Sequence, residues 1–134
     1  MLVRYGEKDG STFLVGPGGG VHVKEGLPKA AVREVREETG LTVDPFPPRV
    51  LFVEEFLSRK YRHVKIWLLC SLVGGELTKT LGAKKEGIVE VGWYRQEELT
   101  GEVVYPSTLM TIDWHDFLTK TWESRYLELH DASF

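Results

Sequence analysis

The segment from Leu27 to Thr39 constrains the fold of this chain most, because both of its ends are marked. Pro28 suits the first turn of a helix, Gly40 suits the residue after a helix, and no helix-breaking residue lies between them. Ala31 and Val35 give this predicted helix an apolar stripe. The stripe fixes the rotation of the helix against a core, and therefore fixes which side its charged residues occupy.

Three acidic residues crowd one side of the predicted helix. At about 100° per residue, Glu34 and Glu38 lie about 40° apart, and Glu37 lies about 60° to the other side of Glu34. Like charges at the i,i+4 spacing repel and cost stability. One interpretation is an ordinary surface helix, in which Arg33 pairs with Glu37. The other is a metal site, because oxygen-rich clusters suit Mg²⁺ or Mn²⁺, which bind phosphates and activate water.

The sequence before the helix favours the metal site. Gly16-Pro17-Gly18-Gly19-Gly20 can only form irregular backbone, and Glu25 adds a fourth carboxylate. The full pattern resembles the complete signature of the Nudix hydrolase superfamily, with each fixed position filled. It reads Gly19, five residues, Glu25, seven residues, and then Arg33-Glu34-Val35-Arg36-Glu37-Glu38-Thr39-Gly40-Leu41.

The resemblance implies both a fold and an activity. The fold would be α+β, an α/β/α sandwich with a mixed central β-sheet between helices. The activity would be metal-dependent cleavage of a diphosphate bond in a nucleoside diphosphate linked to another moiety. Such substrates include nucleoside triphosphates, dinucleoside polyphosphates, ADP-ribose and nucleotide sugars. The alternative is a non-catalytic Nudix-fold module that binds a nucleotide or a partner. Such a module is expected to lose a metal-binding glutamate, and this chain keeps all of them.

The resemblance also implies a ligand set for Mg²⁺ or Mn²⁺. Glu37 and Glu38 match the principal metal ligands, and Glu34 matches a further ligand or a carboxylate that orients water. A backbone carbonyl near Gly18 or Gly19 would be another ligand, which is a reason for an exposed glycine loop at this place.

Other positions match supporting or catalytic roles in the resemblance. Arg33 matches the arginine that positions the glutamates, and Glu25 matches a residue that supports the helix electrostatically. Gly40 would end the helix in a left-handed conformation. Many relatives use one more carboxylate, from a late loop, as ligand or general base. Glu86 is the first candidate for that role and Glu90 is the second.

Two residues are candidates for substrate contacts. His22 stands where many members of the superfamily have an acidic residue, which changes the charge at the entrance of the site. Tyr61 lies downstream, where some dinucleoside polyphosphate hydrolases carry a tyrosine. Neither belongs to the fixed signature; His22 is otherwise an ordinary loop residue, and the register that places Tyr61 is loose.

The rest of the chain reads as strands with a second helix near the end. A long, largely apolar strand from Val64 to Val73 is expected to be central in its sheet. A loop is expected over residues 81–87, a helical turn over residues 96–99, and a last helix from Ser107 to about Trp122. Further strands are predicted over residues 2–5, 12–15, 50–56 and 88–94.

Length and composition bound the class of protein. The 134 residues are predicted to form a single domain, 1–134. A net charge of −3 is not the basic footprint of a protein that binds a nucleic acid polymer, and no apolar run reaches the length of a membrane span. The expected partner is therefore a nucleotide-type small molecule. A single cysteine, Cys70, excludes an internal disulfide and favours a cytoplasmic location.

The N-terminal end differs from most Nudix chains, which carry an earlier strand before the one read here at residues 2–5. With that strand apparently missing, residues 2–5 are expected to present an unpaired sheet edge. Native proteins usually cover such edges. A homodimer that covers this edge is therefore a further prediction.

Overall fold

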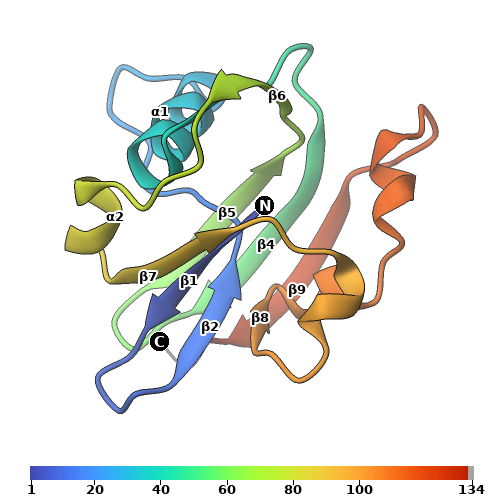
Figure 1. The fold of residues 1–134 in the computed structure, drawn as a ribbon. Coiled ribbons are helices and arrows are strands. Elements are labelled where there is room, and N and C mark those ends of the chain that lie inside the picture. The colour runs from blue at the N-terminus through green and yellow to red at the C-terminus, as the bar shows by residue number, and fades with distance from the viewer. Residues whose placement is uncertain (133–134) are drawn as a thin grey trace.

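The computed structural model describes residues 1–132, which form three sheets flanked by helices (Figure 1). The largest sheet has the order β7-β1-β2-β8, with the bounds Ile88–Gly92, Leu2–Gly6, Thr12–Val15 and Val104–Tyr105. A second sheet has the order β5-β4-β9, with the bounds Arg62–Leu68, Val50–Leu57 and Arg125–Asp131. Both sheets are mixed, because β8 pairs with β2 and β9 pairs with β4 in parallel, whereas their other pairs are antiparallel. Strands β3 (Leu41–Asp44) and β6 (Ser71–Gly75) form a separate antiparallel pair.

The helices lie on two sides of the sheets. Helix α1 (Leu27–Thr39) and the short α2 (Leu81–Lys85) lie together on one side. Three one-turn 3-10 helices lie on the opposite side of the view, namely η1 (Gln96–Leu99), η2 (Ser107–Met110) and η3 (Trp114–Leu118) (Figure 1). The expected α+β class with mixed sheets is confirmed. The second helical layer of the sandwich is reduced to these short turns.

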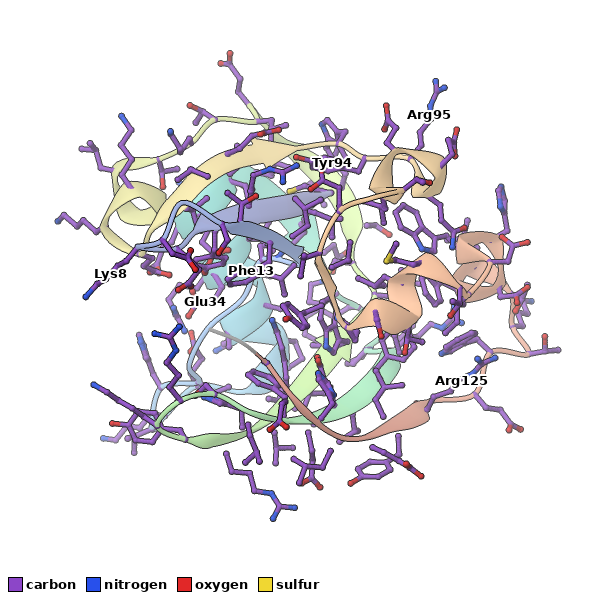
Figure 2. The ribbon with its side chains drawn as sticks, turned by 90° about the horizontal axis from the view of Figure 1, so that it is seen from below. Lys8, Phe13, Glu34, Tyr94, Arg95 and Arg125 are labelled. Atoms are coloured by element: carbon purple, nitrogen blue, oxygen red, sulfur yellow. The ribbon has the colours of Figure 1, made fainter. Side chains whose placement is uncertain are left out.

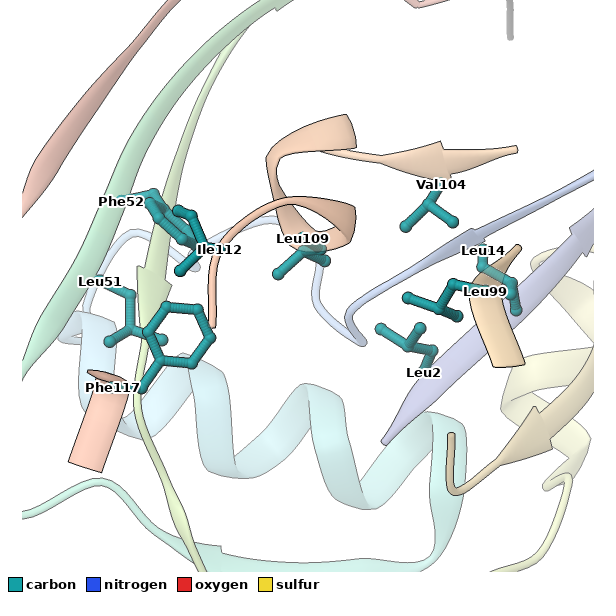
Figure 3. Close-up of a cluster of buried hydrophobic side chains, with 9 residues drawn as sticks. All are labelled: Leu2, Leu14, Leu51, Phe52, Leu99, Val104, Leu109, Ile112 and Phe117. Carbon is teal, nitrogen blue, oxygen red and sulfur yellow. The ribbon is translucent and has the colours of Figure 1, made fainter. Parts of the chain in front are cut away.

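The main apolar core joins the two mixed sheets to the 3-10 helices (Figure 3). Phe52, on one side of this core, is fully buried and meets the rings of Phe117 and Trp122 edge-on, at centroid distances of 5.7 and 5.9 Å. The other buried members are Leu2, Leu14, Leu51, Leu99, Val104, Leu109 and Ile112. This core packs residues near the start and the end of the chain against β4. None of its buried members comes from α1.

The predicted last helix, from Ser107 to about Trp122, is wrong. The segment forms η2 and η3 instead, and its apolar residues still enter the core. Short polar side chains between them bond to the backbone in place of a continuing helix. The Thr111 hydroxyl donates to the Thr108 carbonyl at 3.2 Å, and the Asp113 carboxylate accepts from the His115 amide at 2.9 Å.

Two further expectations need correction. The long strand predicted over residues 64–73 is two strands, because β5 ends at Leu68 and β6 begins at Ser71 with a different partner, β3. The loop predicted over residues 81–87 contains α2. Its cap is Thr80, whose hydroxyl oxygen accepts from the Ala83 amide at 3.0 Å.

Strand β1 does not present an open edge. It lies between β7 and β2 and is paired along both sides. The structural reason given for a homodimer is therefore wrong. None of the helices within residues 1–132 is long and apolar enough to span a membrane.

Candidate active site

Helix α1 carries the acidic residues, and its C-terminal end is fixed as the sequence predicts. Gly40 has a φ of 74° and donates its amide to the Arg36 carbonyl at 3.0 Å. A Cβ at this position would lie 2.6 Å from the Glu76 carbonyl oxygen, so only glycine fits both the dihedral angle and the space. The helix therefore ends at Thr39, and the chain turns directly into β3.

Arg33 connects three of the four signature carboxylates. Its guanidinium binds Glu25 through two hydrogen bonds of 2.9 and 2.8 Å. It also donates to Glu34 at 2.7 Å, to Glu37 at 3.2 Å and to the Gly20 carbonyl at 2.8 Å. The hydrogen bond from Arg33 is the main cause that lowers the pKa of Glu25 to about 2. Arg33 thus fixes the positions of these acids relative to the glycine loop.

Glu38 is the fourth signature carboxylate and differs from the others, since it is fully buried and does not touch Arg33. It accepts hydrogen bonds from the Gly18 amide at 3.2 Å and from the Tyr5 hydroxyl at 3.4 Å. Burial, together with the charges of Glu86 and Glu34, raises the pKa of Glu38 to about 8. Within residues 1–132, no cationic side chain lies within ion-pair distance of this carboxylate.

The glycine loop approaches the helix so closely that side chains would not fit. A Cβ on Gly19 would lie 2.6 Å from Oε1 of Glu34 and 2.7 Å from its Cδ. The neighbouring Gly18 gives its amide to Glu38. The loop backbone therefore lies against two of the glutamates, beside the strands that carry Tyr5 and Phe13, whose rings stack at 5.3 Å (Figure 2).

Helix α2 brings Glu86 toward the same place. Thr80, its capping residue, also donates its hydroxyl to the Glu37 carbonyl, which ties α2 to α1. Glu86 follows α2 directly and is exposed. Its charge acts on both Glu38 and Tyr5, since it raises the pKa of each. Glu86 therefore lies close enough to take part in the site.

The second late-loop candidate, Glu90, lies in other surroundings. It accepts a hydrogen bond from the Tyr94 hydroxyl at 2.7 Å and pairs with Arg4 at 3.4 Å. These contacts hold the Glu90 carboxylate on strand β7 beside β1. Glu90 is thus held by Tyr94 and Arg4, whereas the charge of Glu86 acts on Glu38.

The two candidates for substrate contacts lie in different places. His22 is exposed in the loop before α1, and its Nδ1 lies 4.0 Å from Glu25. Tyr61 lies at the tip of the β4–β5 hairpin, where its ring meets His63 edge-on at 6.2 Å and its amide donates to Ser58. Only His22 is brought next to the signature carboxylates by contacts within residues 1–132.

The oxygen donors of the site fit a hard divalent cation, although their side chains do not point at one common position. In the described part of the chain, no three His, Cys, Asp or Glu side chains are arranged as a ready metal-binding group. Arg33 instead holds Glu34 and Glu37. The available donors are carboxylate and backbone oxygens, which Mg²⁺ and Mn²⁺ prefer. Burial and the neighbouring carboxylates raise the pKa of Glu38, so a divalent cation bound here would offset an excess of negative charge.

Sequence reasoning missed two side chains beside the glutamates. Tyr5 reaches Glu38 from β1, and Lys65 reaches the glycine loop from β5, with Cε 3.9 Å from the place of a Cβ on Gly18. The signal for Lys65 was present, because a lysine interrupts the apolar run from Val64 to Trp67. Tyr5 offered no comparable signal, since a tyrosine in a short strand is ordinary.

Comparison with known families and structures agrees with this geometry. The family model described as "NUDIX domain" matches residues 1–112. A search of curated proteins gives no significant match. Among solved structures, an ADP-ribose pyrophosphatase from Streptococcus suis 89-1591 is 23% identical, with a TM-score of 0.62 over 92% of this chain and 87% of that chain.

A second similar structure is a UDP-X diphosphatase, 18% identical, with a TM-score of 0.63 over 95% of this chain and 60% of that chain. Likeness at these identities shows the fold, whereas the family match covers most of the chain. The chain therefore belongs to the Nudix family, which confirms, at the level of the family, the hydrolase that the signature led us to expect.

Proposed function

We propose that this protein is a divalent-metal-dependent pyrophosphohydrolase. Its substrate would be a nucleoside diphosphate linked to another moiety, such as a nucleoside triphosphate, a dinucleoside polyphosphate, ADP-ribose or a nucleotide sugar. The observation that carries the proposal is the buried Glu38, which lies with Glu34 against the glycine loop and makes no ion pair within residues 1–132. Both similar structures are named for cleavage of a diphosphate, which agrees with this substrate class.

Some residues of the site would bind the metal, and others position the metal-binding residues. Glu34, Glu37 and Glu38, with the backbone near Gly19, would hold Mg²⁺ or Mn²⁺. A bound divalent cation would neutralise phosphate charge and lower the pKa of a coordinated water. Arg33 and Glu25 keep the glutamates in place through the hydrogen bonds described above.

Glu86 is the residue that we propose as general base. It is exposed to water, and its charge acts on Glu38 without a hydrogen bond between the two carboxylates. A general base must lie within reach of the attacking water, and an exposed carboxylate beside the site is accessible to water. Its position after α2 depends on the hydrogen bond from Thr80 to α1.

The experiment that tests the function is a turnover screen with Mg²⁺ and with Mn²⁺. It covers nucleoside triphosphates, dinucleoside polyphosphates, ADP-ribose and nucleotide sugars. Glu38→Gln keeps the size of the side chain, and we expect it to lower kcat by about 10²–10³-fold, the typical cost of one preorganised electrostatic contact. The matched control is Glu97→Gln, in the exposed turn η1, which should leave turnover unchanged.

Two results would contradict the proposal. Near-normal turnover in Glu38→Gln would remove Glu38 from the metal site. No turnover of any diphosphate, together with no effect of metal on melting, would support the non-catalytic module instead. The homodimer and the cytoplasmic location remain predictions, and light scattering and cell fractionation test them.

A further inference from the structure

Strand β5 places one cation on a face that is otherwise interior. Alternate residues of a strand share a face, so Lys65 lies on the same face as Trp67 and His63. Trp67 packs against both apolar clusters, and its ring lies so close to the glycine loop that a Cβ on Gly16 would be 2.4 Å from it. The Lys65 side chain thus runs between the sheets, under the loop that contacts the glutamates.

The ammonium group of Lys65 makes no close ion pair, although the charges of Glu54 and Glu38 act on it from a greater distance. Within residues 1–132 it makes no hydrogen bond and no ion pair within 4.0 Å, and it lies over the face of the Trp67 ring, 4.8 Å from the ring centroid. Glu54, directly opposite on β4, is buried but already bonded, since it accepts from Trp67 Nε1 at 2.7 Å and lies 3.3 Å from His130. A half-buried cation without a close ion pair is costly, and such groups cluster at functional sites.

The surroundings indicate what that ligand is. Lys65 lies beside Gly18, whose amide binds Glu38, so it borders the proposed metal site directly. A positive charge at this border repels a second cation and attracts an anion. The anion that must lie beside the metal-binding glutamates during the proposed reaction is the phosphate chain of the substrate.

We propose that Lys65 binds a phosphate group of the substrate, on the side of the site opposite α1. This inference rests on the proposed function, because it takes the acidic side of α1 as the metal site. Lys65 and the metal would then contact the diphosphate from two sides, with the aromatic face of Trp67 below the ammonium. The flexible stem of lysine allows the charge to reach a phosphate oxygen without a rearrangement of β5.

The test measures binding of inorganic pyrophosphate to the full chain by calorimetry, in the presence of Mg²⁺. We expect Lys65→Met to weaken pyrophosphate binding at least about tenfold, since a charge-assisted contact in a partly buried site is lost. Lys65→Arg keeps the charge and should restore most of the affinity. The matched control is Lys60→Met, which removes the same charge from the exposed turn of the same hairpin and should bind as the wild type does.

Thermal melting separates a ligand-binding lysine from a structural one. Removal of a half-buried charge that makes no close ion pair should leave the melting temperature of Lys65→Met unchanged or raise it. Pyrophosphate affinity in Lys65→Met equal to that in Lys60→Met would overturn the inference, and so would a wild type that does not bind pyrophosphate. A lower melting temperature in Lys65→Met, with affinity lost equally in Lys65→Arg, would also overturn it, by showing a structural role.

Failure of the proposed function gives a different result. If the wild type cleaves no diphosphate yet binds pyrophosphate in a manner that depends on Lys65, the inference stands and the hydrolase proposal fails. If the wild type cleaves a diphosphate and Lys65→Met binds pyrophosphate normally, only the inference fails.

Discussion

Replacement of Gly19 by alanine tests whether the close approach of the glycine loop to Glu34 matters for turnover. The new Cβ would lie 2.6 Å from Glu34 Oε1, and ordinary contact begins at 3.4 Å, so the carboxylate must move by about 0.8 Å. Misplacement of a reacting group by about 1 Å costs up to about 10²-fold in rate. We therefore expect kcat/KM to fall by about 10-fold to 10²-fold.

The same change should affect stability much less. Glu34 is the flexible end of a side chain, so it can rotate away at the expense of its 2.7 Å hydrogen bond from Arg33. Loss of one such charge-assisted bond lowers the free energy of unfolding by at most about 3 kcal/mol. The assay compares initial rates and melting curves of Gly19→Ala with those of Gly20→Ala, where a Cβ meets no atom within 4 Å. Equal rates in the two variants would refute the reasoning.

Three further predictions concern charge. Mg²⁺ at a hundredfold excess over its Kd should stabilise the fold by about 2.7 kcal/mol, and Glu38→Gln should reduce this gain in thermal melts. Glu86→Gln should lower kcat more than Glu90→Gln, because the charge of Glu86 acts on Glu38, whereas Glu90 is held by Tyr94 and Arg4; equal rates would remove Glu86 as the base. Arg4 lowers the pKa of Glu102 through hydrogen bonds of 2.7 and 3.0 Å, so this pair stabilises the fold above about pH 4.5 and is lost as the pH falls through the lowered value. Glu102→Gln should therefore lower the melting temperature at pH 7 but not at the acidic end of that range.

The signature region could be predicted from the sequence because its local signals agree with one another. Pro28, the apolar stripe and Gly40 all indicate the same helix, and the helix observed has the predicted ends. The rotation of that helix then determines which acids face the glycine loop. In this segment the residues that define the helix also determine where its acidic side chains lie.

The strand partners could not be predicted, because they depend on pairings distant in sequence. Nothing in the apolar run from Val64 to Val73 shows where the chain leaves β4 and joins β3. Strand β9, with its exposed and charged residues, carries too little apolar alternation to be recognised. The sequence marks Lys65 as a charge within an apolar run, but its position beside Gly18 depends on how the glycine loop packs against β5.

Strand β9 matters for how the protein is made. It pairs Arg125 with Phe52, so β4 keeps an open edge during translation until residues 125–131 have left the ribosome. Phe117 and Trp122, the ring neighbours of Phe52, are also synthesised late. Phe117, Trp122 and β9 all follow residue 112, where the family match ends. A chain cut at that border would expose Phe52 and an unpaired strand, and we expect it to aggregate rather than fold.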